Sequence, residues 1–328
     1  MAEKFGVYLD LRKMKDSRPK QISKQLTKNH TNLLIKMSTI TIIVQNAGLT
    51  GLAAIKALNA TAGNCTVRVA SRDAAKLREK LTKENAKAEV FAIDDDEFFV
   101  GANRFIAIPP GGTPAPETRV TTALEFLTKA NAAGATHGVV LSVVVADRRR
   151  GLFGEQWSEV ESFAAAQEGS TVVAVRAPMF FGNMWGDVAT VKSHDTFYMP
   201  IAGDTKQLSA AVADVGAAMA ASVLDVDLGN KIVNVFGDNL TKNEIAALYS
   251  KKLGRPIKFV QVPKEAATEA FKAFGLPLWQ IEGVIELFDN VETDTFVDEH
   301  RGEFEALVGR PAMTVEQYID AALIHGLK

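Results

Sequence analysis

The chain has 328 residues, of which 47% are hydrophobic and 23% are charged, so it is long enough for a large α/β unit or two domains and too apolar to be wholly disordered. The net charge of −2 conceals two unlike parts: residues 1–36 hold nine Lys/Arg against three Asp/Glu, a charge of +6 that leaves −8 on the rest. An acidic body argues against direct binding of nucleic acid.

Cysteine and histidine usage limits the chemistry further. Cys65 is the only cysteine, which excludes an internal disulfide and favours a reducing, cytoplasmic location. No histidine pair has metal-ligand spacing, so we expect no metal site. No apolar run approaches the roughly 18–20 residues of a membrane helix, and we expect no membrane association.

The composition and the pattern of apolar residues change twice along the sequence, which predicts three segments. Residues 1–37 are polar and basic, and we expect a flexible extension; its alternative role is an address or a contact with an anionic partner. Residues 38–178 alternate apolar runs with helical stretches and are expected to form the α/β core. Residues 179–328 are expected to form a smaller α+β lobe, with some of its elements woven into the core.

Strands and helices alternate through the core, which predicts an α/β fold with a doubly wound parallel sheet and helices on both faces. Strands are expected at Ile40–Val44, Thr66–Ala70, Glu89–Ile93, Arg104–Ile108, Gly138–Val145 and Thr171–Arg176. Helices are expected at Gly51–Ala60, Ala74–Asn85, Glu117–Ala133 and Trp157–Ala166. The lobe is expected to contain helices at Ser209–Leu224 and Lys242–Leu253 and strands at Lys231–Phe236 and Ile257–Val262.

A tight turn with glycines follows the first strand. Gly48 and Gly51 fit two spacings of the dinucleotide fingerprint, with Asn46 at the first glycine of one and Gln45 at that of the other. Asn46 is the milder departure because asparagine tolerates left-handed backbone angles. Backbone N–H groups and a helix dipole converge there, which favours a pyrophosphate, although a simple strand-to-helix connection is the alternative. The predicted pyrophosphate-binding residues are Asn46, Gly48, Leu49, Thr50 and Gly51.

The end of the second strand predicts the choice of cofactor. An acidic residue there would bind a ribose 2′-hydroxyl, but this chain has Ser71 and Arg72, with Lys76 one helical turn later. A guanidinium fork and a hydroxyl suit a 2′-phosphate, so NADP(H) is favoured over NAD(H). Asp73 could oppose a phosphate, but it fits equally well as the N-cap of the next helix. A solvent-exposed arginine at a helix start is the alternative interpretation.

These motifs, taken in order, resemble the NmrA-like branch of the atypical short-chain dehydrogenase/reductase superfamily, which has an NAD(P)-binding Rossmann fold. The resemblance covers about Ser38 to Lys328, and the order of individually weak motifs carries it. They are Gly48–Gly51, Ser71–Lys76, Ala92–Asp95, Ile108–Pro110, Leu141-Ser142, Trp157–Glu161, Val175–Pro178, Phe181–Asn183, Gly254–Pro256 and Gly309–Pro311.

The resemblance implies that residues 38–178 bind the cofactor and that residues 179–328 hold the substrate. It implies an adenine contact at Asp94, a cofactor-lining loop at Ile108 and Pro109, a nicotinamide neighbour at Ser142, and a substrate pocket at Phe181 and Asn183.

The chain departs from the superfamily in its chemistry. Its reductases use a Tyr-x-x-x-Lys pair, but none of the four tyrosines here has a lysine four residues later. Trp157 stands where NmrA-like proteins often keep the lysine, and the catalytic residues stay unassigned. The segment between Asp96 and Arg104 also looks too short for the helix that the family has there.

Three hypotheses follow. The first is an NADP(H)-binding oxidoreductase with weak activity on a quinone or another small conjugated carbonyl, since reduction of such an acceptor needs less specific acid catalysis. The second is a catalytically silent redox sensor that reports the state of NADP(H) to a protein partner. The third is an α/β scaffold whose turn has lost phosphate binding through Gln45 and Asn46.

Overall fold

The computed structural model describes residues 39–293 and 300–327. The described residues belong to one compact unit, Ile40–Lys328. The prediction of a flexible basic extension over residues 1–37 lies outside the described residues.

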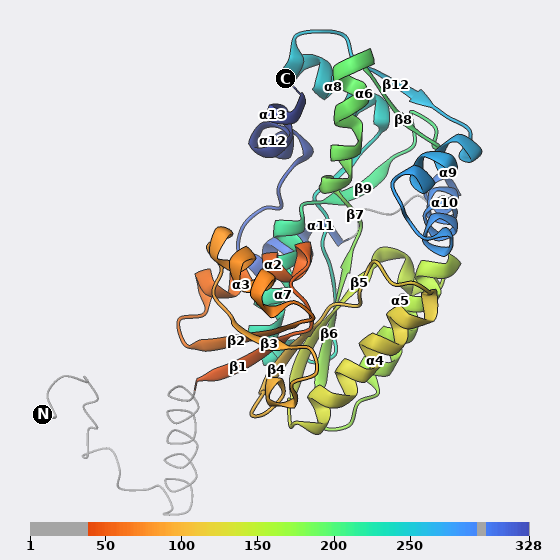
Figure 1. Cartoon of the computed structure of the whole chain (residues 1–328). Coiled ribbons are helices and arrows are strands. Elements are labelled where there is room, and N and C mark those ends of the chain that lie inside the picture. Colours follow the sequence, from red (N-terminus) through yellow and green to blue (C-terminus); the bar gives the residue numbers. More distant parts are fainter. Residues whose placement is uncertain (1–38, 294–299, 328) are drawn as a thin grey trace, which may run out of the picture. The chain divides into compact units, whose positions relative to one another are not determined.

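A seven-stranded parallel sheet forms the centre of this unit, in the order β10-β6-β5-β4-β1-β2-β3 (Figure 1). Its strands are β1 (Ile40–Val44), β2 (Cys65–Ser71), β3 (Glu89–Ala92), β4 (Arg104–Ala107), β5 (His137–Val143), β6 (Thr171–Ala177) and β10 (Ile232–Asn234). β2 and β3 follow β1 on one side, and β4 then pairs with the other side of β1. The strand order therefore reverses between β1 and β4. Such a switch point is where open α/β sheets bind ligands.

Helices cover both faces of the sheet. Figure 1 shows α4 (Pro116–Ala132) and α5 (Gly151–Ala165) on one face, and α2 (Leu49–Thr61), α3 (Ala74–Lys83) and α7 (Val212–Leu224) on the other. Adjacent strand residues alternate between the two resulting cores: Ile42 packs toward α2 and α7, whereas Ile43 packs toward α4. Burial on both faces explains why the inner strands are largely apolar, and the sheet with helices on both faces confirms the predicted doubly wound α/β fold.

The lobe contains two small sheets, of order β11-β9-β7 and β12-β8. Its strands are β7 (Met179–Phe180), β8 (Thr196–Met199), β9 (Gln207–Ala210), β11 (Asp238–Leu240) and β12 (Lys258–Gln261). Its helices include α6 (Val188–His194), α8 (Lys242–Leu253), α9 (Lys264–Ala273), α10 (Leu278–Thr293), α12 (Val315–Tyr318) and α13 (Ile324–Leu327), whereas α11 (Arg301–Val308) packs against β10 and α7. The lobe has its own aromatic core.

Several predicted elements needed correction. The helix expected over Ser209–Leu224 begins only at Val212, because the preceding residues form β9 and pair with β7 and β11. The helix expected from Trp157 already begins at Gly151, whereas the boundaries of α8 are as predicted. The short connection between Asp96 and Arg104 holds a single 3₁₀ turn, as its length implied.

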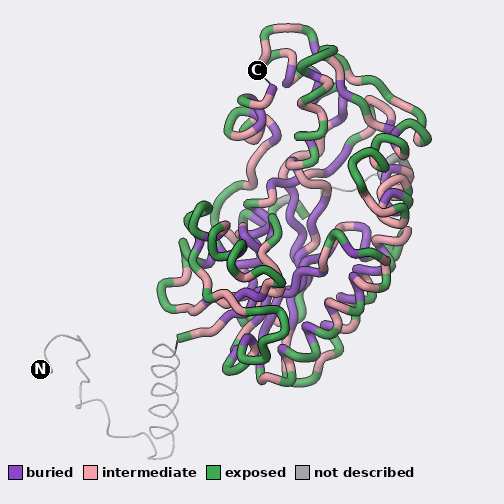
Figure 2. The backbone as a smooth tube through the Cα atoms, viewed as in Figure 1, coloured by how far each residue is buried: buried purple, intermediate pink, exposed green. Residues whose placement is uncertain are grey.

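Burial follows the central sheet (Figure 2). The buried segments are the inner strands, the helix faces that cover them and the core of the lobe, while the outer faces of the helices are exposed. In the described part of the chain, none of the helices combines the length and the apolar character needed to cross a membrane.

Candidate cofactor site

The glycine turn connects β1 to α2 at the switch point. Gly48 is the N-cap of α2, no side chain caps this end, and its first turn holds no acidic residue. The first bond of the helix joins the Leu52 N–H to the Gly48 carbonyl at 3.0 Å, so the N–H groups of the three preceding residues have no helical acceptor. Together with the helix dipole, these donors form a site that favours an anion.

Gln45 and Asn46, the two departures from the glycine fingerprint, fasten this turn to the end of β4. The Gln45 side chain accepts the Ile108 N–H at 2.8 Å and donates to the Thr122 carbonyl at 3.1 Å. The Asn46 amide donates to the Ile108 carbonyl at 2.7 Å and accepts the Gly48 N–H at 3.0 Å. Both backbone groups of Ile108 are therefore held by residues of the turn.

The structure gives a different reason for an asparagine at position 46 than the predicted one. We expected a left-handed backbone there, but Asn46 is not among the non-glycine residues with positive φ. Its side chain makes the turn, and its backbone does not need special freedom. Gly51 is the position with a steric requirement, because a Cβ there would lie 1.9 Å from the Asn46 carbonyl oxygen.

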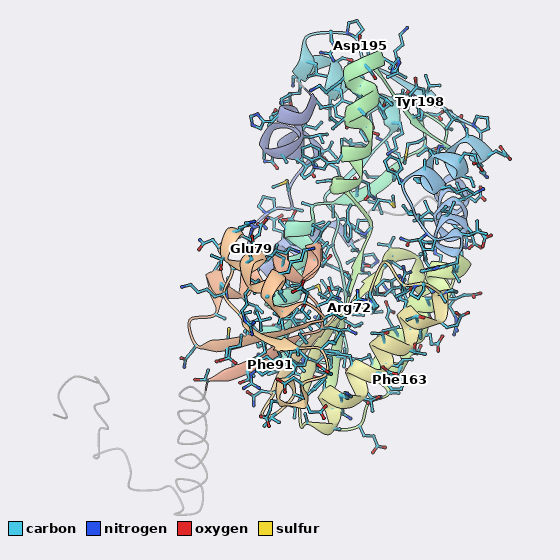
Figure 3. The ribbon with its side chains drawn as sticks, in the orientation of Figure 1. Arg72, Glu79, Phe91, Phe163, Asp195 and Tyr198 are labelled. Atoms are coloured by element: carbon cyan, nitrogen blue, oxygen red, sulfur yellow. The ribbon has the colours of Figure 1, made fainter. Side chains whose placement is uncertain are left out.

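The predicted 2′-phosphate residues lie together where β2 runs into α3. Asp73 is the N-cap of α3 and accepts the Lys76 N–H at 2.9 Å, so its carboxylate is used by the helix. The Ser71 hydroxyl accepts the Asp73 N–H at 3.1 Å. Arg72, which Figure 3 labels, and Lys76 are both exposed, and neither forms an ion pair within the described residues.

Lys80 is a neighbour of the site that the sequence analysis missed. It lies one turn after Lys76 on α3, and its Nζ donates to the Ala47 carbonyl in the glycine turn at 2.8 Å. The i, i+4 spacing of the two lysines was the available signal, because it puts both on one face of a helix that begins at the ligand edge.

The remaining predicted cofactor residues follow neighbouring strands. Asp94 is exposed in the turn after β3, and Ile108 and Pro109 are buried directly after β4. The carboxyl ends of parallel strands meet at one edge, so these residues border the same edge as the glycine turn.

Ser142 lies near the carboxyl end of β5 and is fully buried. Its hydroxyl donates to Glu161 of α5. Glu161 also accepts two bonds from Arg176 of β6, at 2.9 and 2.8 Å, and this pair is largely buried. The structure thus links Ser142 to a carboxylate and a guanidinium from two of the motifs that carry the family resemblance, and the contact of Ser142 with a nicotinamide stays a prediction.

Two aromatic residues lie on one face of α5. Trp157 is the residue that the resemblance puts at the superfamily's lysine position, which stays a prediction, and Phe153 lies four residues earlier on the same face. Both rings lie beside the guanidinium of Arg119, whose Cζ is 5.1 Å from the centroid of Phe153 and 5.9 Å from that of Trp157. Burial lowers the pKa of Arg119 to about 10. Neither ring can donate a proton, so neither can replace the general acid of a Tyr-x-x-x-Lys pair.

The two predicted pocket residues have different surroundings. Phe181 is fully buried in the lobe core, with its ring centroid 5.5 Å from that of Tyr318. Asn183 is exposed two residues later, in a 3₁₀ segment that runs to Asp187. The pocket role of both residues stays a prediction.

The lobe also buries two charged groups. Lys242, at the start of α8, donates to the Gln207 side chain at 2.6 Å, and burial lowers its pKa to about 8. Asp187 accepts the Tyr249 hydroxyl at 3.1 Å, and burial raises its pKa to about 6. The burial of Lys242 was not predictable from the sequence, because a lysine in the first turn of a helix is ordinarily exposed.

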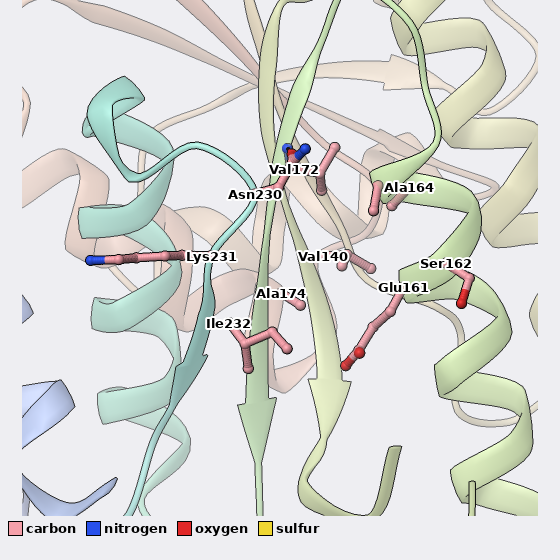
Figure 4. Close-up of a pocket in the computed structure, with 10 residues that line it drawn as sticks. Val140, Glu161, Ser162, Ala164, Val172, Ala174, Asn230, Lys231 and Ile232 are labelled. Carbon is pink, nitrogen blue, oxygen red and sulfur yellow. Dashed lines mark hydrogen bonds between the residues drawn. The ribbon is translucent and has the colours of Figure 1, made fainter. Parts of the chain in front are cut away.

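A hollow of about 220 Å³ lies between α5, β6 and β10 (Figure 4). Val172 and Ala174 of β6 and Ile232 of β10 form its floor, and the Lys231 side chain points away from it. Its strand residues lie toward the amino ends of β6 and β10, away from the edge with the glycine turn. Within the described residues, no group of three or more His, Cys, Asp or Glu side chains could hold a metal ion.

Comparisons with known proteins agree with this geometry. The sequence model of the NmrA-like family matches residues 36–319. A curated relative, the NAD(P)H azoreductase of Xenophilus azovorans, is 24% identical over 258 residues, which cover 76% of this chain and 87% of the azoreductase.

Solved structures share the fold at low identity. The NADPH-dependent quinone oxidoreductase QOR2 of Escherichia coli, complexed with NADPH, matches with a TM-score of 0.71 at 22% identity, over 87% of this chain and 100% of that one. NmrA, a negative transcriptional regulator solved in complex with NAD, matches with a TM-score of 0.64 at 15% identity, over 88% and 97% of the two chains.

Proposed function

Because this chain belongs to the NmrA-like family, we propose that it binds a nicotinamide dinucleotide and uses it as an NADPH-dependent oxidoreductase. The glycine turn is the observation that carries the proposal. Its end of α2 has backbone donors without helical acceptors and no acidic residue, which suits a pyrophosphate. With the switch point between β1 and β4, the adenosine half would lie over β2 and β3 and the nicotinamide half over β4 and β5.

NADP(H) is the proposed cofactor, with Arg72 and Lys76 as the cations for its 2′-phosphate. Asp73, the residue that could repel a phosphate, is engaged as the helix N-cap. The relatives leave the choice open, because QOR2 was solved with NADPH and NmrA with NAD. The preference therefore rests on the side chains of this chain.

The proposed substrate is a quinone or another small conjugated carbonyl. When bound, the cofactor supplies a hydride. A ketone that accepts it becomes an alkoxide, which needs a proton donor, and Phe153 and Trp157 provide none. A reduced quinone instead spreads its negative charge over an aromatic ring, so water suffices to protonate it. Quinone reduction therefore needs less from this site than ketone reduction does, which favours a quinone as the proposed substrate.

A binding titration tests the cofactor proposal. NADPH and NADH are titrated into the wild type, Arg72→Ala and the control Lys87→Ala, an exposed cation before β3. Loss of a charge-assisted bond worth about 1.5–3 kcal/mol should weaken NADPH binding by about tenfold or more in Arg72→Ala. NADH affinity should stay within about twofold. Equal losses for both nucleotides contradict the NADP(H) preference, and no binding by the wild type contradicts the cofactor proposal itself.

A turnover assay tests the enzymatic part. NADPH oxidation is followed with a series of quinones and with saturated ketones. We expect oxidation with quinones and none with ketones. Ketone reduction at a comparable rate would mean that a proton donor exists outside the positions of Phe153 and Trp157.

The second candidate function is a silent redox sensor with a protein partner. The missing Tyr-x-x-x-Lys pair favours it, and one structural relative is a transcriptional regulator. A sensor should bind NADPH without oxidising it in the presence of any quinone tested, and its affinities for NADPH and NADP⁺ should differ. For either function we propose a cytoplasmic location, since Cys65 is the only cysteine.

A further inference from the structure

Arg119 is a buried cation without a carboxylate partner. It lies in the first half of α4, is 5% exposed, and forms no ion pair within the described residues. A lone buried charge is costly, so its surroundings must replace both the lost water and a counter-ion. Three aromatic rings and three oxygen atoms do so.

The aromatic rings come from α5 and α10. The Arg119 Cζ is 4.8 Å from the ring centroid of Trp279, in addition to its contacts with Phe153 and Trp157. The rings of Phe153 and Trp279 meet edge to face, at 89° and 6.5 Å. Negative ring faces stabilise a cation, most strongly where water is excluded. These rings form a cage, defined here as Phe153, Trp157 and Trp279.

The oxygen atoms belong mainly to the loop that follows β4. Arg119 Nε donates to the Pro110 carbonyl at 3.1 Å, and Nη2 donates to the Gly111 carbonyl at 3.1 Å. Nη1 donates to the Gln156 side chain at 3.0 Å, which anchors the guanidinium to α5. Trp279 adds a third bond to the loop, from its indole N–H to the Thr113 carbonyl at 3.1 Å.

The same loop is fastened at its other end by the glycine turn. The Ile108 N–H is bonded to Gln45 and the Ile108 carbonyl to Asn46. Two residues later, the Pro110 carbonyl accepts a bond from Arg119. The loop therefore runs from the switch point toward α5 with its backbone directions fixed from both sides. In the proposed binding mode, this is the path beside the nicotinamide half.

We infer that Arg119, held in the cage, is a positioning residue that fixes the 108–113 loop for the nicotinamide half of the cofactor. The inference rests on the proposed function for its ligand, and on the bonds to Pro110 and Gly111 for its mechanism. Trp157 thereby has a role that a lysine could not serve, because a lysine at position 157 would bring a second cation toward the guanidinium.

The test separates the two halves of the cofactor. NADPH and adenosine 2′,5′-bisphosphate, which lacks the nicotinamide half, are titrated into the wild type, Arg119→Met and Arg119→Lys. Arg119→Met should weaken NADPH binding by about tenfold and leave the bisphosphate within about twofold, because only the nicotinamide side loses its preformed loop. Arg119→Lys keeps the cation and should fall between. Lys129→Met is the matched control, since Lys129 also lies on α4 beside an aromatic ring, 5.7 Å from the centroid of Phe99.

Hydrogen exchange gives a readout that needs no nucleotide. The amides of Gly111, Gly112 and Thr113 should exchange faster in Arg119→Met than in the wild type, and those of the glycine turn should not. Equal weakening of both ligands, or unchanged NADPH binding, overturns the inference. If the wild type binds neither ligand, the proposed function and the cofactor part of the inference both fail. In that case, unchanged hydrogen exchange in Arg119→Met also contradicts the claim that Arg119 fixes the 108–113 loop. Arg119→Lys replaces Arg119→Met in this measurement if the first variant does not fold.

Discussion

Replacing Asn46 with alanine tests whether this side chain makes the glycine turn. The change removes two hydrogen bonds, the donation to Ile108 at 2.7 Å and the acceptance from Gly48 at 3.0 Å. Alanine fits without new contacts, since the backbone at Asn46 has no positive φ. The effect can therefore be assigned to the lost amide rather than to backbone strain.

The magnitude follows from those two bonds. Each contributes about 1 kcal/mol net, and the half-buried Ile108 carbonyl loses its partner, so the free energy of unfolding should fall by about 2–3 kcal/mol. In a domain of this size, that corresponds to a decrease in Tm of about 4–10 °C. NADPH affinity should also fall, because the turn that presents the α2 N–H groups is less well defined.

Urea unfolding followed by tryptophan fluorescence measures the first quantity, and a thermal scan measures the second. Asn64→Ala is the control, because Asn64 is exposed and its side chain makes no hydrogen bond in the structure. We expect less than about 0.5 kcal/mol for the control. If the two variants are equally stable, the side-chain bonds of Asn46 do not hold the turn, and the account given for it is incorrect.

Three further predictions concern single positions. Gly51→Ala should abolish NADPH binding or folding, since its Cβ would lie 1.9 Å from the Asn46 carbonyl; a folded variant with normal affinity would contradict that geometry. Lys80→Met should weaken NADPH binding several-fold and reduce its salt dependence, whereas Lys87→Met should do neither. Burial lowers the pKa of His137, so its neutral ring stabilises the fold above the unfolded pKa of 6.5, and this contribution is lost as the pH falls. In urea titrations, the difference in the free energy of unfolding between wild type and His137→Gln should therefore narrow from pH 8 to pH 5. A constant difference would contradict a stabilising role for the neutral His137 ring.

The central sheet was predictable because its signals are local. Each inner strand is buried on both faces, so runs such as Ile40–Val44 carry the pattern by themselves. The strands of the lobe were not predictable in the same way. β7 has two residues and β9 has four, and β9 is a strand only because β7 and β11 pair with it across long sequence distances. Its alanines extend the helical pattern of α7, which is why the helix was expected to begin too early.

The site was predictable where backbone geometry follows from residue type. Gly48 and Gly51 lie at the turn, and Arg72 is exposed at the end of β2, as expected from their places in the pattern. Side-chain partners were not accessible, because they depend on which loops meet in space. Asn46 was judged on its backbone tolerance, and Arg119 was not considered at all, because its three ring neighbours and two loop carbonyls come from segments up to 160 residues away.

The fastening of the glycine turn to the end of β4 also affects the thermodynamics of ligand binding. A fingerprint with three glycines is free to rearrange and must lose that freedom when a phosphate docks. Here Gln45 and Asn46 have already removed it during folding, through four hydrogen bonds. Docking of an anion on α2 would then carry little ordering entropy, and the heat capacity change of binding should be small, as for a rigid receptor.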